Sequence, residues 1–375
     1  MASPPRLPGI DALKGLACVM IVWHHLAFYG PMSDVVHPFA PALMEWLYDY
    51  GRMAVQVFLV VSGFLVAASL APQGVAVFDS PARLIFRRYW RLVKPYLVAL
   101  AVSVLVAALI RPWFVHASVP AAPTLLQLMA HMFLLQDVLG QEALSAGVWY
   151  VAIDVQLYAM VVLVFAFARR FQFQQGESGD AAHATSASST VAAPLGISLV
   201  LLFALASLLF FNRQSAFDIT ALYFCGSYAL GMLAFWASSN LGARRSFWLI
   251  AMALMGGLAL TLDFRGRLVV ALVTAFGLVG LAWLSPNAWP VRWLQQPQLV
   301  QLGRISYSVF LIHFPVCLLV NAIVSYFWPT QLVANVTGLL LAFVLSLLAG
   351  SALYRWVECR PVLEGNGWLR RMFAN

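Results

Sequence analysis

Several ionisable side chains of this 375-residue sequence lie inside apolar stretches. Burying an ionisable group in hydrocarbon costs free energy, so such residues usually have a function. The first such stretch contains Asp11, Lys14, His24 and His25. Lys14 and His25 are eleven residues apart, so they share one helix face and lie about 16 Å apart along its axis. A cation and an imidazole in this arrangement suit one polar cavity. Lys14 also fits a topology anchor that snorkels, and the histidines also fit hydrogen bonds within a helix bundle.

A second group of ionisable residues is cationic and precedes another apolar stretch. Arg87, Arg88, Arg91 and Lys94 fall within eight residues. Arg88 and Arg91 are i, i+3 neighbours on a helix, and paired guanidinium groups are fixed forks that recognise phosphate. The same cations also fit a cytoplasmic anchor that attracts anionic lipid.

A carboxylate and an amide, Asp154 and Gln156, lie within the apolar segment Trp149–Tyr158. If this segment enters the membrane from outside, Asp154 lies about 8 Å below the outer surface, at a level similar to that of His25. A buried carboxylate near a histidine can set its tautomer and stabilise its protonated form. Asp154 also fits a pairing with some other polar group of the bundle.

Two further segments place polar residues in apolar surroundings. Ser62 and Gly63 interrupt an apolar run, and small residues at such positions favour close helix packing. The segment Leu302–Pro315 contains Ser306 and His313 and ends on a proline expected to kink the helix. His313 fits a packing hydrogen bond as well as a functional group.

Composition places these residues in a membrane protein. The sequence is 62% hydrophobic and 10% charged, with a mean hydropathy of +0.85, whereas soluble domains carry about 25% charged residues. The net charge of +8 does not indicate a nucleic-acid partner, because the basic residues lie between apolar spans. The four cysteines lack metal-ligand spacing, and we predict no metal site. Stretches of about 20 apolar residues predict ten transmembrane helices near 9–29, 52–71, 93–111, 147–168, 193–211, 217–238, 246–262, 267–285, 305–327 and 332–356.

Charge predicts the orientation of these ten spans. With the N-terminus inside, 17 of the 22 Lys and Arg residues fall on the cytoplasmic side, as the positive-inside rule requires. The short apolar segment Thr124–Leu139 is then a re-entrant or interfacial helix, since an eleventh span would reverse every later loop. We therefore expect an all-α, polytopic membrane protein with one domain over residues 1–375 and both termini cytoplasmic. Residues 172–190 are expected to form a flexible cytoplasmic loop. The sequence shows no internal repeat, and this argues against a secondary transporter, since many transporters are built from two related halves.

Taken together, these motifs resemble those of the membrane-bound acyltransferase family three, bacterial enzymes that O-acylate polysaccharides and other extracytoplasmic glycans. Lys14 stands where Arg is commoner in that family, and Asp154 with Val155 stands where many members have two Glu. The resemblance runs in order from residue 9 to about residue 361 and rests on Asp11–Gly15, Lys14 with His25, Arg88 with Arg91, Phe58–Leu65, Trp149–Tyr158, Leu302–His313 and Tyr354–Glu358.

The resemblance implies an O-acetyltransferase of the bacterial inner membrane. It implies acyl-CoA, expected to be acetyl-CoA, as the cytoplasmic donor, no permanently bound cofactor, and a glycan or lipid-linked sugar as the acceptor. His25 is then the general base or acyl carrier, with Asp154 orienting it, while Lys14, Arg88 and Arg91 hold the donor. Asp11, Ser62, Trp149, Gln156, Tyr158, Ser306, His313 and Glu358 are further candidate site residues. A carrier or flippase for an anionic lipid or sugar, and a sensor or scaffold, are the alternatives.

Overall fold

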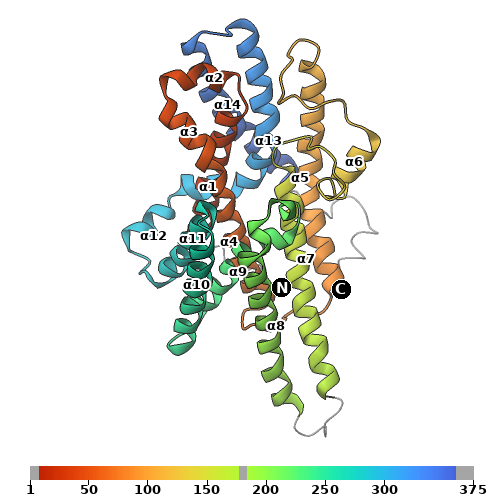
Figure 1. The fold of residues 1–375 in the computed structure, drawn as a ribbon, viewed down its shortest axis with the longest axis vertical. Helices are drawn as coiled ribbons and strands as arrows, with labels where there is room; N and C mark the ends of the chain where they lie inside the picture. Colours follow the sequence, from red (N-terminus) through yellow and green to blue (C-terminus); the bar gives the residue numbers. More distant parts are fainter. Residues whose placement is uncertain (1–7, 177–183, 360–375) are drawn as a thin grey trace. The chain divides into compact units, whose positions relative to one another are not determined.

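The computed structural model describes residues 8–176 and 184–359, and helices are the regular structure throughout these ranges. Figure 1 shows their order along the chain. The main helices are α1 Pro8–Phe28, α2 Met32–Val36, α3 Pro41–Tyr50, α4 Val55–Leu70, α5 Pro81–Ile110, α6 Leu125–Met132, α7 Val148–Gly176, α8 Ala184–Leu209, α9 Ala221–Ser239, α10 Ala243–Leu262, α11 Gly266–Trp283, α12 Trp289–Leu294, α13 Pro297–Phe327 and α14 Leu332–Leu353. Short 3-10 turns lie at His37–Phe39 (η1), Gly51–Ala54 (η2), Phe211–Arg213 (η3) and Ser215–Phe217 (η4), and α14 continues into a π-helical turn, Tyr354–Glu358 (η5).

The predicted all-α class and the ten spans are confirmed. Within the described residues, ten helical segments are long and apolar enough to cross a membrane. Among those that begin well before the predicted spans, α5 starts at Pro81 and α13 at Pro297. The hydropathy pattern ends at the cations that precede each span, but Arg and Lys are good helix formers and the helix continues through them. Proline at the first helical position then marks each true start.

The segment Thr124–Leu139 forms only a short helix. Within it α6 covers eight residues and begins with a capping box between Thr124 and Gln127. A helix of that length is about 12 Å long, which is too short for a hydrocarbon core of about 30 Å. The predicted short helix is therefore confirmed, and its interfacial placement stays a prediction. At the predicted loop 172–190, α7 continues to Gly176 and α8 begins at Ala184, while residues 177–183 lie outside the described ranges.

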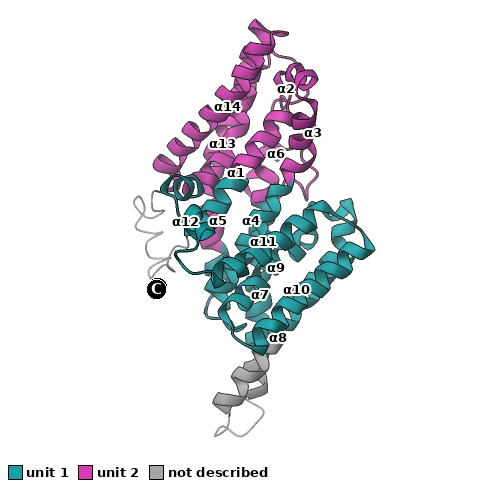
Figure 2. Ribbon diagram, turned by 90° about the vertical axis from the view of Figure 1, so that its left-hand side faces the viewer, with its two compact units in different colours: residues 1–17, 53–85, 152–303 teal, residues 18–52, 86–151, 304–375 magenta. Residues whose placement is uncertain are grey.

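The chain divides into two compact units, coloured separately in Figure 2. Unit 1 comprises residues 1–17, 53–85 and 152–303, and unit 2 comprises residues 18–52, 86–151 and 304–375. Four helices, α1, α5, α7 and α13, contribute residues to both units. The expectation of a single domain stays a prediction.

Unit 1 is organised around α9, which packs against α4, α8, α10 and α11. Two glycines bring α9 and α4 together. A methyl group added at Gly63 would overlap the carbonyl oxygen of Tyr228, and one added at Gly231 would overlap that of Val60. The small-residue packing predicted at Ser62-Gly63 is therefore present, since only glycine lets these two backbones approach so closely.

A buried arginine joins the ends of three helices in unit 1. Arg265 is 7% exposed and donates hydrogen bonds to the carbonyl oxygens of Leu208 (3.0 Å) and Ala259 (3.1 Å) and to Oδ1 of Asn212 (2.7 Å). Leu208 lies at the end of α8, Ala259 lies near the end of α10, and Asn212 lies in η3. Arg265 itself directly precedes α11. The burial of Arg265 could not be predicted from the sequence, because it depends on where three helices end.

Unit 2 has an apolar core in which the end of α5 meets α13. Ala107 and Ile110 of α5 and Phe114 beyond it pack against Phe314 and Leu318. A buried amide fastens the turn after α1 to the same helix, since Asn321 accepts a hydrogen bond from the Met32 backbone N–H (3.1 Å) and donates one to the Tyr29 carbonyl oxygen (3.0 Å). These contacts determine how α1 leaves the core.

The contact between α4 and α9 gives the first testable prediction. Gly63→Ala should lower the free energy of unfolding in mixed detergent micelles by about 1–3 kcal/mol, because the added methyl group meets a backbone carbonyl that cannot rotate away. Gly257→Ala is the matched control, since a Cβ atom there meets nothing within 4 Å. Equal unfolding midpoints for the two variants would contradict the close approach.

His131 of α6 gives a second prediction, concerning pH. Its Nδ1 donates to the Gln127 carbonyl oxygen (2.8 Å), so its Nε2 accepts the Leu144 backbone N–H (3.2 Å), which an imidazolium cannot do. Burial lowers the pKa of this imidazole below its ordinary value of 6.5, and the Gln127 carbonyl opposes the shift only in part. The unfolded chain therefore binds the proton more readily, and protonation favours unfolding.

As the pH falls below about 6.5, the stability contributed by neutral His131 should be lost. Wild-type protein should therefore lose more stability between about pH 7.5 and pH 5.5 than His131→Gln, whose amide does not titrate. The difference between the two thermal-unfolding midpoints at each pH measures this contribution. A parallel decline in both proteins would assign the pH dependence to other groups.

Candidate active site

Two histidines from helices distant in sequence meet in unit 2. Nδ1 of His25 in α1 lies 2.8 Å from Nε2 of His313 in α13. Their rings are nearly parallel, with centroids 4.8 Å apart and an interplanar angle of 17°. His313 is completely buried, and His25 is partly exposed. The pair therefore has a closed end at His313 and an open end at His25.

The hydrogen bonds around the pair assign the tautomer of each ring. Nδ1 of His313 lies 2.7 Å from the Phe310 carbonyl oxygen, which can only accept, so this nitrogen carries the proton. Nε2 of a neutral His313 is then an acceptor, and Nδ1–H of His25 donates to it. The remaining nitrogen of His25, Nε2, is left with a lone pair. Among the described residues no hydrogen bond to this atom is found, so its lone pair can accept a proton.

Aromatic packing holds the Phe310 end of this relay. The ring of Phe310 contacts Tyr150 edge to face, with centroids 5.4 Å apart. Trp149 precedes Tyr150 at the start of α7 and packs edge to face on it (6.1 Å). Gly147 leaves room for this contact, since a Cβ atom there would lie 2.8 Å from the Phe310 ring. The Trp149 segment therefore helps to position the carbonyl that orients His313.

The neighbouring histidine, His24, faces a different element. It is 6% exposed, and its Nδ1 lies 3.0 Å from the Leu47 carbonyl oxygen of α3. Gly51 allows this close packing, because a Cβ atom there would lie 2.8 Å from Cβ of His24. The 100° turn between successive helical residues thus separates a packing histidine, His24, from the paired His25.

The cationic segment lies in α5 and is held by two tyrosine hydroxyl groups. Arg91 is exposed and Arg88 is partly buried. Tyr89 donates to the Met132 carbonyl oxygen at the end of α6 (2.6 Å), and Tyr307 of α13 donates to the Leu92 carbonyl oxygen (2.8 Å). These two hydrogen bonds fix the rotation of α5 about its axis and therefore the direction in which its cations point.

Two other candidate residues of unit 2 have structural partners. Glu358 of η5 accepts a hydrogen bond from the hydroxyl of Ser308 (2.6 Å), so the closing motif is joined to α13. Ser306 is buried, and its carbonyl oxygen accepts the Cys18 thiol (3.3 Å). Both contacts hold α13, which carries His313.

Unit 1 holds the first part of α1 with its ion pair. Nζ of Lys14 lies 2.7 Å from Oδ1 of Asp11, one turn earlier in the helix. Gly15 and Gly303 lie beside this pair, and a Cβ atom on either would collide with the backbone of the other helix. The opening motif and the Leu302-Gly303 motif therefore meet through glycine, which brings α1 and α13 into backbone contact.

The remaining candidates of unit 1 lie on α7 and α4. Asp154 is 3% exposed and Tyr158 is 8% exposed, so both are buried. Oε1 of Gln156 accepts the backbone N–H of Ala221, the first residue of α9 (3.0 Å), and thereby satisfies one of the unpaired donors of that helix end. Ser62 is partly buried beside the Gly63 contact. Gln156 and Ser62 thus serve the packing of unit 1.

The candidate residues therefore fall into two sets. Unit 2 brings His25 together with His313 and contains Arg88 and Arg91, whereas unit 1 contains Lys14 and Asp154. Whether Asp154 and Lys14 share a cavity with His25 stays a prediction.

Sequence analysis named His313 but did not pair it with His25. The predicted ninth span began at residue 305, which put His313 about 12 Å along it, against about 24 Å for His25 in the first span. The helix begins eight residues earlier, at Pro297, so His313 lies about 24 Å from its start. Pro297 at the start of the helix was the sequence signal from which similar positions of His25 and His313 along their helices could have been predicted.

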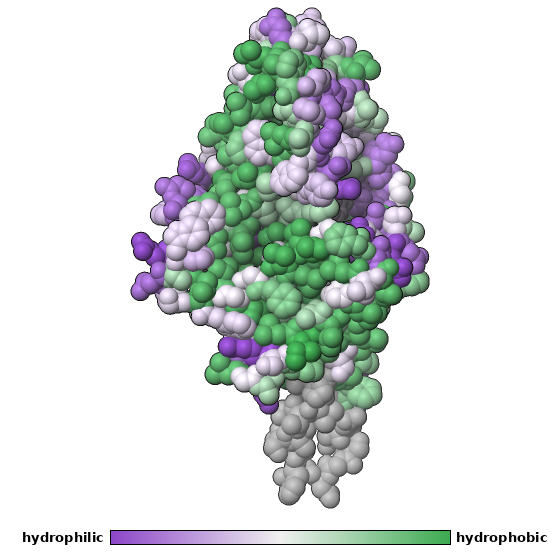
Figure 3. Space-filling model, turned by 60° about the vertical axis from the view of Figure 1, so that its left-hand side comes forward, coloured by the Kyte–Doolittle hydropathy of each residue, from purple (hydrophilic) through white to green (hydrophobic). Residues whose placement is uncertain are grey.

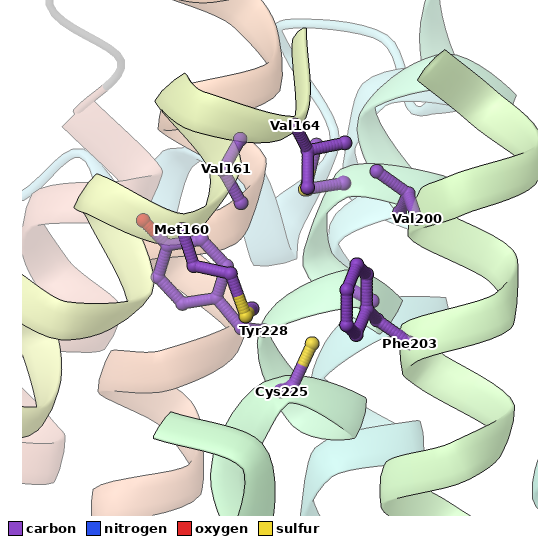
Figure 4. Close-up of a pocket in the computed structure, with 9 residues that line it drawn as sticks. Met160, Val161, Val164, Val200, Phe203, Cys225 and Tyr228 are labelled. Atoms are coloured by element: carbon purple, nitrogen blue, oxygen red, sulfur yellow. The ribbon is translucent and has the colours of Figure 1, made fainter. Parts of the chain in front are cut away.

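Neither a metal centre nor a second polar site stands out in the described parts of the chain. No group of three His, Cys, Asp or Glu side chains within residues 8–176 and 184–359 could hold a metal ion. A cavity of about 10 Å³ between α7, α8 and α9 has an apolar lining that includes Met160, Phe203 and Cys225 (Figure 4). At that volume the cavity holds about one water molecule, so it offers no room for chemistry comparable to that of the histidine pair.

The ten spans and the hydrogen-bonded histidine pair define a helical membrane protein with a candidate active site, and sequence comparison gives its family. The model of a family described as an acyltransferase domain matches residues 7–355, and the chain belongs to this family of acyltransferases. The chain is also similar to the O-acetyltransferase OatA of Staphylococcus aureus strains NCTC 8325 / PS 47, COL and MRSA252. Each is 23% identical over 387 aligned residues, which cover 96% of this chain and 57% of the relative. The chain thus spans little more than half the length of these relatives, and no solved structure matches it.

Proposed function

We propose that this protein transfers an acetyl group from cytoplasmic acetyl-CoA to a hydroxyl group of an extracytoplasmic or lipid-linked glycan. The observation that carries the proposal is the hydrogen-bonded pair of His25 and His313, which leaves Nε2 of His25 available as a base in a member of an acyltransferase family. The printed name of the relatives, O-acetyltransferase, supports acetyl as the group and oxygen as the acceptor atom.

In the proposed reaction, Nε2 of His25 removes the proton of the acceptor hydroxyl group. The hydroxyl oxygen attacks the carbonyl carbon of the acetyl-CoA thioester at the same time. The C–O bond forms, the C–S bond breaks, and the CoA thiolate leaves with the electron pair and takes the proton back from His25. A positioned base of this kind contributes about 10²–10⁴-fold to the rate.

His313 serves this step as a positioning residue. While His25 carries the extra proton, its Nδ1–H still donates to Nε2 of His313, which in turn donates through Nδ1–H to the Phe310 carbonyl oxygen. The relay keeps the ring of His25 in one orientation and stabilises the imidazolium. Sequence analysis gave this orienting role to Asp154. The hydrogen bond between the two histidines supports His313 in this role, and the role of Asp154 stays a prediction.

The donor end of the proposed site is the cationic segment of α5. Arg88 and Arg91 are i, i+3 neighbours, and two guanidinium groups so placed can bind the phosphates of CoA in the bidentate manner that carboxylates and phosphates favour. The excess of Lys and Arg on one side of the predicted topology supports a cytoplasmic position for this segment, on the side where acyl-CoA is made.

Substitution of the histidine pair tests the chemistry. His25→Ala should lower kcat for acetyl transfer by about 10²–10⁴-fold with little change in the Kd for CoA, because the base acts in the transition state. His313→Ala should also lower kcat, and His313→Gln should restore part of it, since the amide oxygen can accept the proton of Nδ1 of His25. His24→Ala is the control and should be milder. Full acetyl transfer by folded His25→Ala would show that His25 is not the base, whereas wild-type protein that binds CoA but transfers no acetyl group would favour a carrier.

Substitution of the arginine pair tests donor binding. Arg91→Ala should weaken CoA binding by about 1.5–3 kcal/mol, the usual contribution of a charge-assisted hydrogen bond. Arg83→Ala, an exposed arginine two turns earlier in α5, is the control and should bind CoA like the wild type. Isothermal titration of the purified proteins in detergent measures both. Unchanged affinity in folded Arg91→Ala would make Arg91 a topology anchor.

A further inference from the structure

A surface groove lies between α10 and α11 of unit 1. Its volume is about 400 Å³, and every residue that lines it is apolar: Leu249, Ile250 and Ala253 from α10, and Phe276, Val279, Gly280 and Trp283 from α11. The lining positions on α11 extend over eight residues, from Phe276 to Trp283, which is about 10 Å of helix. That length is about a third of a hydrocarbon core. The groove is therefore suited to part of a single hydrocarbon chain.

A glycine lines this groove. At Gly280 an added Cβ atom would meet nothing within 4 Å, and the lining residues Ile250 and Phe276 are 56% and 37% exposed. Both helices belong to spans that are apolar enough to cross a membrane. Figure 3 shows how widely apolar side chains cover one face of the molecule. Such a groove in a spanning helix pair faces lipid, not water.

A cation stands at one end of this groove. The guanidinium carbon of Arg245 lies 4.6 Å from the centroid of the Trp283 ring, and its Nε donates to the Asn240 carbonyl oxygen (3.1 Å). The contact with Trp283 places the cation at the end of the groove where α10 begins and α11 ends. Arg244 is its exposed neighbour. The groove thus has an apolar length and a cationic end.

The charge at this end is not balanced by the two helices. The one acidic residue between residues 240 and 300 is Asp263, just after the far end of α10 and about 27 Å along the helix from Arg245. Among the described residues no ion pair involves Arg244 or Arg245. Tryptophan beside arginine is typical of the level at which lipid headgroups lie.

We propose that this groove binds one anionic glycerophospholipid, with an acyl chain along Gly280 and the phosphate against Arg245 and Arg244. The groove supplies apolar contact for the chain, and the arginines supply attraction for a net negative headgroup, which a zwitterionic lipid lacks. The site is independent of the proposed acetyl transfer, and its test needs no enzymatic activity.

The experiment measures lipid retained by the full-length protein in detergent by native mass spectrometry, after exposure to dioleoyl phosphatidylglycerol or dioleoyl phosphatidylcholine. We expect wild-type protein to retain the phosphatidylglycerol with about tenfold preference. Arg245→Gln should remove the preference, and Gly280→Leu should lower retention of both lipids by filling the groove.

Matched controls accompany both variants. Gly277→Leu adds the same side chain to α11 at a glycine that is equally open but does not line the groove, and Arg292→Gln removes an exposed arginine outside it. Both should retain lipid like the wild type. Equal retention of the two lipids by wild-type protein would overturn the proposal, as would Gly277→Leu acting like Gly280→Leu. A dimer that Gly280→Leu disrupts would overturn it too, by making this face an interface between copies of the chain.

Discussion

The exclusion of water from the hydrocarbon core is the constraint on which the rest of this structure depends. Each backbone N–H and C=O group inside the membrane must find a partner within the protein, so the chain crosses as helices. Side chains that still have hydrogen-bonding capacity then use the carbonyl oxygens that remain accessible. Tyr307 with Leu92 and His313 with Phe310 are examples. The same constraint that forms the helices therefore also orients the side chains of the candidate active site.

The helices are joined in two ways, by close backbone contact at glycines and by hydrogen bonds from polar side chains. In unit 1, Gly63 and Gly231 bring α4 and α9 into backbone contact, and Gly15 and Gly303 do the same for the starts of α1 and α13. In unit 2, a hydrogen bond holds His25 of α1 at 2.8 Å from His313 of α13. Dispersion contacts at glycine give proximity, and hydrogen bonds add direction.

The two proposed ligand sites use the same kinds of residue for different ends. At the histidine pair, burial and a chain of hydrogen bonds set the tautomer of a reacting group. At the groove between α10 and α11, Arg245 packs over the Trp283 ring at one end of an apolar surface that includes Gly280. The first arrangement suits chemistry on a bound substrate, and the second suits recognition of a membrane component.

The sequence by itself determined the all-α class, the ten spans and the membership of an acyltransferase family, because apolar length and the order of short motifs are properties of a linear chain. It did not reveal where α5 and α13 begin, since hydropathy falls at cations although the helix continues. Only the tertiary structure decided that His25 pairs with His313, that Glu358 binds Ser308 and that Arg265 is buried. Each of these contacts joins residues tens to hundreds of positions apart, and helix packing alone sets which side chains of distant helices come within hydrogen-bonding distance.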